Sequence, residues 1–127
     1  MAYSITESEQ IILEQLWEHG KLSIMQLVEA LEETTGWSKH TIISFLKRME
    51  EKQTVTYVVE GRTRYYSAVP KRSEVVIESA QSVLDRFFGG RMGLMVSYMA
   101  DARKLTREDV DELYSLLDKL KKKDEEK

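Results

Sequence analysis

The 127-residue chain predicts a mainly α-helical fold with one small β-hairpin. Apolar residues recur at helical spacing before residue 50 and again beyond Pro70. Between these stretches, from Val55 to Val69, the apolar period changes to the alternation typical of strands. The positive charge of the chain is also gathered in one short segment, which contains the third predicted helix and the hairpin.

The first two predicted helices each begin with a capping box. Thr6 with Glu9, and Ser23 with Gln26, have the spacing at which two side chains and two backbone amides satisfy each other. Gly20 supplies the stop of the first helix. We predict that the buried stripes of the two helices consist of Ile12, Leu13, Leu16 and Trp17, and of Ile24, Leu27, Val28 and Leu31.

The next elements complete a recognisable order. A short strand is predicted at Lys21–Leu22, and a third helix after the N-cap Ser38, with a buried face of Ile42, Leu46 and Met49. The hairpin turns at Glu60–Arg62. Tyr65 and Tyr66 alternate on its second strand, so one packs inward and the other lies exposed. Helix, strand, helix, helix and hairpin is the order of a winged helix-turn-helix, in which the hairpin is the wing.

Beyond Pro70, three further helices are predicted, and they carry more apolar surface than they can bury alone. We therefore predict a winged-helix DNA-binding domain at residues 1–72 and a three-helix dimerisation domain at residues 73–127. The charged tail from Lys121 to Lys127 is predicted to be frayed. The predicted dimer contacts are Phe87, Phe88, Leu94, Met95, Tyr98, Met99, Leu113 and Leu117.

Charge is distributed unevenly along the chain, whose net charge is −3. Residues 1–37 contain one cation and seven carboxylates, whereas residues 38–72 contain eight cations and three carboxylates. A basic helix and a basic hairpin inside an acidic domain predict double-stranded DNA as the partner. The predicted DNA contacts are Ser38, Lys39, His40, Thr41, Ser44, Lys47 and Arg48 on the helix, and Arg62 and Arg64 on the wing.

Other classes of protein are disfavoured by composition. The chain has no cysteine and two histidines, His19 and His40, at the end of one predicted helix and the start of another. We therefore expect no metal site, no cofactor and no enzymatic activity. No apolar stretch approaches the length of a membrane span, and the N-terminus lacks the pattern of a signal peptide. We expect a cytoplasmic protein without direct membrane insertion.

Short stretches from Ile5 to about Leu117 match one family in order and spacing. They are Ile5–Glu9, Leu16–Glu18, Gly36–Ser38 with Thr41–Ile42, Leu46–Arg48, Glu60–Arg62 with Tyr65–Tyr66, and Phe87–Gly90. In these stretches the chain resembles the penicillinase repressor family (the BlaI, MecI and CopY group), whose members control β-lactam resistance or copper homeostasis in bacteria. The resemblance implies a winged-helix domain, a C-terminal dimerisation module, and a homodimeric repressor on a palindromic operator.

The chain also departs from that family. The family usually has a lysine at His40, a basic residue at Ile43 and a glycine at Gln53. Ile43 either contacts a thymine methyl or lowers affinity, and Gln53 requires a different helix end. In the β-lactam branch, the resemblance implies relief of repression by a membrane-bound sensor protease that cleaves after an asparagine. The aligned bond here is Tyr98–Met99, which lacks the asparagine.

A dimeric, sequence-specific repressor is the leading hypothesis for function. A winged-helix protein-interaction module without specific DNA binding is the alternative, favoured by Ile43 and by the negative net charge. Non-specific architectural DNA binding is a third hypothesis. Genomic context or selection of bound DNA would separate them.

Overall fold

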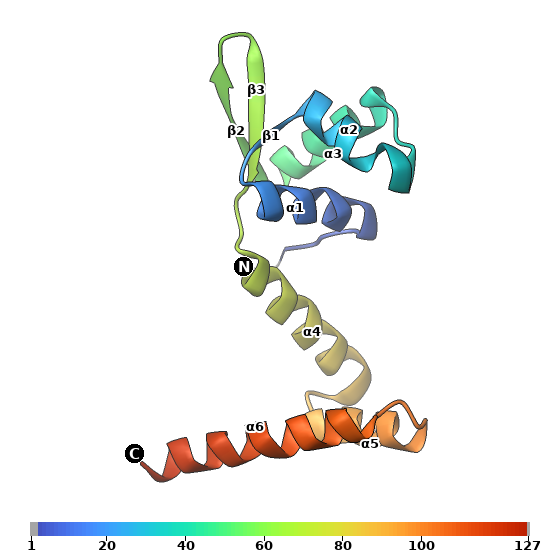
Figure 1. The fold of residues 1–127 in the computed structure, drawn as a ribbon, viewed down its shortest axis with the longest axis vertical. Coiled ribbons are helices and arrows are strands. Elements are labelled where there is room, and N and C mark those ends of the chain that lie inside the picture. Colours follow the sequence, from blue (N-terminus) through green and yellow to red (C-terminus); the bar gives the residue numbers. More distant parts are fainter. Residues whose placement is uncertain (1–2, 127) are drawn as a thin grey trace. The chain divides into compact units, whose positions relative to one another are not determined.

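The computed structural model describes residues 3–126, and the chain divides between Ala80 and Gln81 into two compact units. As predicted, the fold is mainly helical with one small sheet (Figure 1). The predicted domain boundary at residue 72 stays a prediction. The elements are α1 (Glu7–His19), β1 (Leu22–Ser23), α2 (Ile24–Thr35), α3 (Lys39–Glu51), β2 (Val55–Glu60), β3 (Thr63–Ala68), α4 (Arg72–Phe88), α5 (Met92–Asp101) and α6 (Arg107–Glu125).

The sheet is antiparallel and has the strand order β1-β3-β2. Tyr66 on β3 lies between its partners Leu22 on β1 and Tyr57 on β2. Two residues connect β2 to β3, and the first of them, Gly61, has a φ of +66° that favours glycine. Because β3 also pairs with β1, the hairpin β2–β3, which we call the wing, is connected to the helices through this short strand.

The predicted N-terminal caps are present in the structure. Thr6 and Glu9 form a complete capping box at α1, and Ser23 and Gln26 form one at α2. The Ser38 side chain accepts a hydrogen bond from the backbone of α3, as predicted. Each cap depends on neighbours within three residues, which is why the sequence alone locates the helix starts.

One core holds the N-terminal unit together. Its buried members come from α1, α2, α3 and the sheet, and they are Ile12, Leu13, Leu16, Leu22, Leu27, Leu31, Ile42, Leu46, Met49, Val55 and Tyr66. The predicted buried face of α3 is confirmed, since its members are at most 1% exposed. Tyr66 is the inward tyrosine of the wing. Trp17 packs against this core and donates its indole N–H to the Pro70 carbonyl at 2.9 Å.

A buried carboxylate ties the start of α1 to the end of α3. Glu9 is 1% exposed, and its Oε1 and Oε2 accept hydrogen bonds from Lys52 Nζ at 2.8 and 3.2 Å. Lys52 also donates to the Ser4 carbonyl at 2.9 Å. Burial acts to raise the pKa of Glu9, but hydrogen bonds from Lys52 and from the Thr6 backbone outweigh it and hold this pKa below its ordinary value.

The end of α3 corrects one expectation. Gln53 was expected to require a different helix end from the family's glycine, yet it adopts the left-handed conformation with a φ of 65°. The Gln53 amide donates to the Glu50 carbonyl, and the Thr54 amide donates to the Met49 carbonyl. These bonds satisfy carbonyls at the helix end, so the hydrogen-bonded geometry overrides the preference for glycine.

The C-terminal unit buries far fewer hydrophobic side chains than the N-terminal unit. Within residues 81–126, Leu84 is the one buried hydrophobic side chain. Phe88 and Tyr98 meet edge to face, with ring centroids 5.5 Å apart. The predicted fraying from Lys121 is wrong as far as Glu125, to which α6 continues, and Lys127 lies outside the described residues. Good helix formers and the i,i+4 pair of Lys122 with Asp118 favour this continuation.

Candidate nucleic-acid interface

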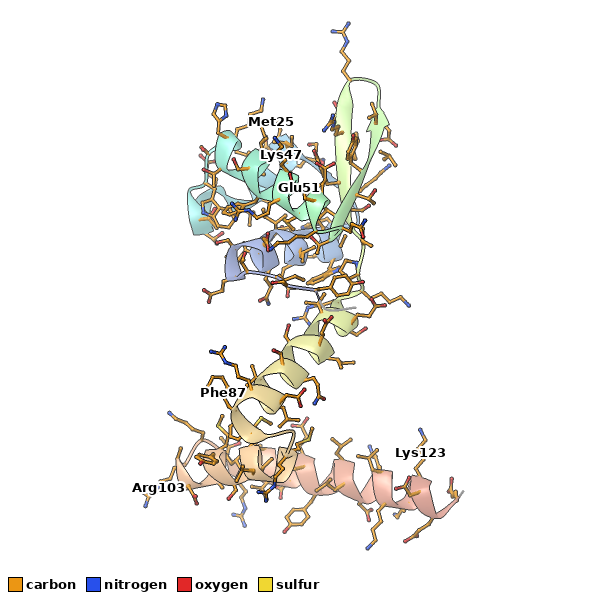
Figure 2. The ribbon with its side chains drawn as sticks, turned by 180° about the vertical axis from the view of Figure 1, so that it is seen from behind. Met25, Lys47, Glu51, Phe87, Arg103 and Lys123 are labelled. Atoms are coloured by element: carbon orange, nitrogen blue, oxygen red, sulfur yellow. The ribbon has the colours of Figure 1, made fainter. Side chains whose placement is uncertain are left out.

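The outward face of α3 carries the central residues of the candidate interface. His40, Ser44 and Lys47 are exposed and lie opposite the buried side of the helix. Lys47 is labelled on α3 in Figure 2. The spacing i, i+4 and i+7 places these three side chains in one row, as the sequence predicted. The row offers two nitrogen-bearing side chains and one hydroxyl to an approaching ligand.

The first turn of α3 uses some of its polar groups internally. Ser38 Oγ accepts from the Thr41 amide at 3.2 Å and lies 3.1 Å from Thr41 Oγ1. Both hydroxyls are therefore engaged in the helix start, and Thr41 is half-buried. At 100° per residue, Thr41 and Arg48 lie on one flank of the outward row, whereas Lys39 and Ile43 lie on the other.

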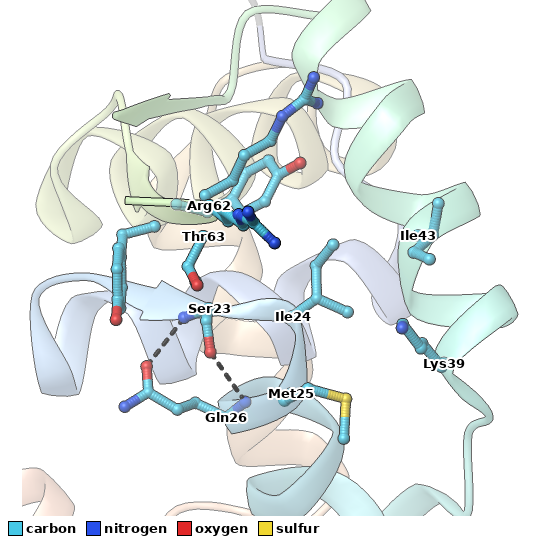
Figure 3. A pocket seen from close by; sticks show the side chains of 11 residues that line it. Ser23, Ile24, Met25, Gln26, Lys39, Ile43, Arg62 and Thr63 are labelled. Carbon is cyan, nitrogen blue, oxygen red and sulfur yellow. Dashed lines mark hydrogen bonds between the residues drawn. The ribbon is translucent and has the colours of Figure 1, made fainter. Parts of the chain in front are cut away.

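A concavity of about 620 Å³ lies between α3, the start of α2 and the wing (Figure 3). It brings together three of the predicted DNA contacts, Lys39, Arg62 and Arg64. The other six predicted contacts do not line it; they are Ser38, His40, Thr41, Ser44, Lys47 and Arg48. Among the described residues, those that line it include no carboxylate. They are Ser23, Ile24, Met25, Gln26, Lys39, Ile43, Arg62, Thr63, Arg64, Tyr65 and Tyr66.

The two wing arginines are held differently, which the sequence did not reveal. The Arg64 guanidinium lies 4.3 Å from the centroid of the Tyr57 ring. The Tyr66 side chain raises the pKa of Arg64 above its ordinary value, and Tyr57 adds to this effect. Arg62, in contrast, is exposed in the two-residue turn at the tip. Arg64 is thus oriented before any ligand arrives, whereas Arg62 is free to adapt.

The one carboxylate of the wing is paired. Glu60 accepts from Lys21 Nζ at 2.7 Å, and the same nitrogen lies 5.5 Å from the centroid of the Tyr65 ring. The pair is about half exposed and contributes little to stability. Lys21 does, however, offset the negative charge that Glu60 places near the two wing arginines.

The structure adds residues that the sequence reasoning missed. Met25, on the first turn of α2, lines the concavity and is 51% exposed. A signal was present, because Met25 lies off the predicted buried stripe of α2. It could not be interpreted without knowing that α2 begins next to the wing. Over residues 3–126, no three His, Asp or Glu side chains are placed to hold a metal ion, and no helix has the length and apolar character to cross a bilayer.

The predicted dimer contacts lie in the C-terminal unit. Phe87, Tyr98 and Leu117 are 65%, 62% and 60% exposed. A second concavity of about 450 Å³ between α5 and α6 is lined by residues that include Met95, Met99 and Leu113. The Tyr98–Met99 bond lies within α5. A protease that binds extended substrates would therefore have to unwind this helix first.

Comparison with known proteins identifies one family over most of the chain. A family model described as Penicillinase repressor matches residues 5–119. The penicillinase repressor of Bacillus licheniformis is 27% identical over 122 residues, which cover 96% of this chain and 95% of that protein.

Solved structures are similar to the N-terminal part. The solution structure of the DNA-binding domain of the repressor BlaI matches with a TM-score of 0.53 at 24% identity, covering 58% of this chain and 90% of that one. The Bacillus licheniformis BlaI monomeric form, in complex with the blaP half-operator, matches with a TM-score of 0.50 at 25% identity. That match covers 56% of this chain and 87% of the other. The first likeness supports the winged-helix fold alone.

Proposed function

The chain belongs to the penicillinase repressor family, and we propose that it is a dimeric, sequence-specific repressor of the type that controls antibiotic-resistance genes. It would occupy a palindromic operator in double-stranded DNA. The coarser assignment, to a family of winged-helix transcriptional repressors that are not enzymes, follows from the family membership. The dimer, the operator symmetry and the contact residues are the proposal.

One observation carries the DNA-binding part of the proposal. Lys39, on the flank of the outward row of α3, and the arginines of the wing border the same concavity, and none of the described residues that line it is acidic. A helix that enters the major groove and a basic wing that follows the adjacent backbone require this arrangement. Lys47 and His40 would donate to bases or phosphates, and Arg62 and Arg64 would position the protein on the backbone.

The open C-terminal unit supports the dimer. Large side chains such as Phe87, Tyr98 and Leu117 are mostly exposed in the single chain, which is unfavourable in water. A second copy would cover them through a self-complementary interface with two-fold symmetry. Such symmetry presents two α3 helices to two half-sites and hence implies a palindromic operator.

Induction by a membrane-bound sensor protease is a separate proposal with less support. It rests on the family alone, since Tyr98 replaces the asparagine before the aligned bond and that bond is helical. Incubation with a sensor protease domain followed by mass spectrometry would test it. Cleavage after Tyr98 would support this route, and an intact α5 would exclude it.

Selection of bound sequences from random double-stranded DNA, at a stated salt concentration, tests the central proposal. We expect enrichment of an inverted repeat. The Arg62→Ala/Arg64→Ala variant should bind all sequences more weakly and lower the slope of log affinity against log salt by about one unit per lost contact. Arg103→Ala/Arg107→Ala, which removes the same charge from the C-terminal unit, is the matched control and should leave the slope unchanged.

The possible results separate the three hypotheses. Salt-sensitive binding without any enriched sequence would indicate non-specific architectural binding. Absence of DNA binding at low salt would favour the protein-interaction module, in agreement with the exposed Ile43 and the net charge of −3.

A further inference from the structure

Two exposed apolar side chains line the same concavity beside α3 as the cations Lys39, Arg62 and Arg64. Met25 comes from α2 and Ile43 from α3, and they are 51% and 37% exposed. In Figure 3 both lie at the rim of the same hollow, together with Lys39 and with Arg62 on the wing. The sequence departs from its family at Ile43, but the structure supplies Met25 as its neighbour in this hollow.

Neither side chain belongs to the core. The buried residues of α2 are Leu27 and Leu31, and Ile43 lies about 100° around α3 from the buried Ile42. Exposure of both to water is unfavourable by comparison with burial against an apolar group. Filling of the core therefore does not account for these two apolar side chains.

The charge around the pair identifies the kind of ligand. Lys39, Arg62 and Arg64 line the same concavity, and none of the described residues that line it is acidic. A ligand that fits must present anionic groups at its edge and a small apolar group inside. Duplex DNA has this chemistry, because phosphates border the major groove and the thymine 5-methyl is the apolar group on its floor.

We propose that Met25 and Ile43 together read thymine 5-methyl groups in the operator, so that α2 contributes to base recognition as well as α3. This inference rests on the proposed function, since it requires sequence-specific binding to DNA. Ile43 offers a rigid branched surface, and the flexible Met25 side chain adapts to it from the side of α2. The flanking cations hold the adjacent backbone and fix the depth at which the pair meets the bases.

Replacement of thymine by deoxyuridine tests the proposal, because it removes only the methyl group. Each thymine of the selected operator is replaced in turn, and affinity of the full-length protein is measured by fluorescence anisotropy at fixed salt. We expect one or two positions per half-site at which deoxyuridine lowers affinity about fourfold, as for one buried methylene. In Ile43→Ala and Met25→Ala, the penalty at those positions should shrink or vanish.

Ile11→Ala is the matched control. Ile11 is 38% exposed on α1, close to the value for Ile43, and it does not line the concavity. This variant should retain the full deoxyuridine penalty. Thermal unfolding of all three variants checks that each is folded, which we expect because every substituted side chain is exposed.

The outcomes are distinct. Penalties that persist unchanged in both Ile43→Ala and Met25→Ala, or an operator with no position sensitive to deoxyuridine, would overturn the inference and leave the pair as a surface for a protein partner. The proposed function would survive either result. If the unmodified protein selects no DNA sequence at all, the proposed function fails first, and the inference fails with it.

Discussion

The two units of the chain differ in where their large apolar side chains lie. In the N-terminal unit, Ile12, Leu13 and Ile42 are completely buried. In the C-terminal unit, Phe87 and Leu117 are at least 60% exposed. The first unit has the core that independent folding requires, whereas the described part of the second, residues 81–126, buries Leu84 alone among its hydrophobic side chains. We infer that one unit carries recognition as a finished domain, and that the other is completed only by assembly.

Removal of the C-terminal unit gives the largest expected effect. A fragment that ends at Ala80 should remain folded and monomeric and should bind a full operator about a hundredfold more weakly or worse, because a second half-site no longer adds its binding energy. Ending at Ala80 retains the buried Val75 and the Tyr3 amide to Glu78 hydrogen bond of 2.8 Å. Light scattering and operator titration measure the result. A dimeric fragment would contradict the division of labour between the units.

Matched side-chain substitutions, one in each unit, sharpen the comparison between the two units. Ile42→Ala should lower the free energy of unfolding by about 2–5 kcal/mol, because it leaves a cavity in a closed core. Leu117→Ala should have little effect on a dilute monomer but should weaken self-association. Urea unfolding at several protein concentrations, with sedimentation analysis, distinguishes the two. An equal and concentration-independent loss in both variants would show that the C-terminal unit has a core of its own.

The ion pair between Lys52 and the buried carboxylate of Glu9 links two helices of the N-terminal unit, and it predicts that stability depends on pH. Because folding lowers the pKa of Glu9 below 4.5, the folded state binds fewer protons, so this stability is present above pH 4.5 and is lost as the pH falls through the folded-state pKa. Lys52→Met should cost roughly 1–3 kcal/mol near neutral pH, since it leaves a buried carboxylate without a partner.

The free energy of unfolding, measured between pH 7 and pH 3, tests the contribution of the Glu9–Lys52 pair. The acid-dependent loss should shrink in Glu9→Gln. Glu14→Gln is the control, since Glu14 pairs with Arg72 in an exposed salt bridge that is worth little. An unchanged pH profile in Glu9→Gln would show that Glu9 is not the group responsible.

The smallest expected effect concerns two helix ends with the same backbone conformation. Gln53 and Arg103 have φ values of 65° and 58°, which are unfavourable for residues other than glycine. Gln53→Gly should stabilise the N-terminal unit by about 1 kcal/mol, seen as a higher Tm. Arg103→Gly, at the end of α5, should instead raise the stability of the C-terminal unit and depend on protein concentration. A lower Tm for Gln53→Gly would mean that its side chain makes a compensating contact.

Local features of the fold could be predicted because their determinants are close in sequence. Thr6, Ser23 and Ser38 start their helices through bonds to residues three positions away. The buried face of α3 followed from its period, and the outward row followed from that face. The contact roles of those side chains stay predictions.

The remaining features depend on contacts between distant segments. Met25 joined the candidate site because the start of α2 lies beside the wing. Arg64 is held by Tyr57 across the sheet, and Lys52 reaches Glu9 from 43 positions away. No local pattern contains these pairs. The continuation of α6 to Glu125, in contrast, has a local cause. The charged chain end was expected to fray, but its residues have a strong helix propensity that keeps them helical.

The pairing of β2 with β3 also restricts how the wing can change in length over evolution. Tyr57 faces Tyr66, and Glu60 faces Thr63 across a connection of two residues. Insertion of a single residue into β3 would exchange the faces of its side chains, bringing Tyr65 towards the core and turning Arg64 outward away from Tyr57. Growth by two residues preserves every face. Relatives with longer or shorter wings should therefore differ from this chain by even numbers of strand residues, unless a bulge absorbs the odd one.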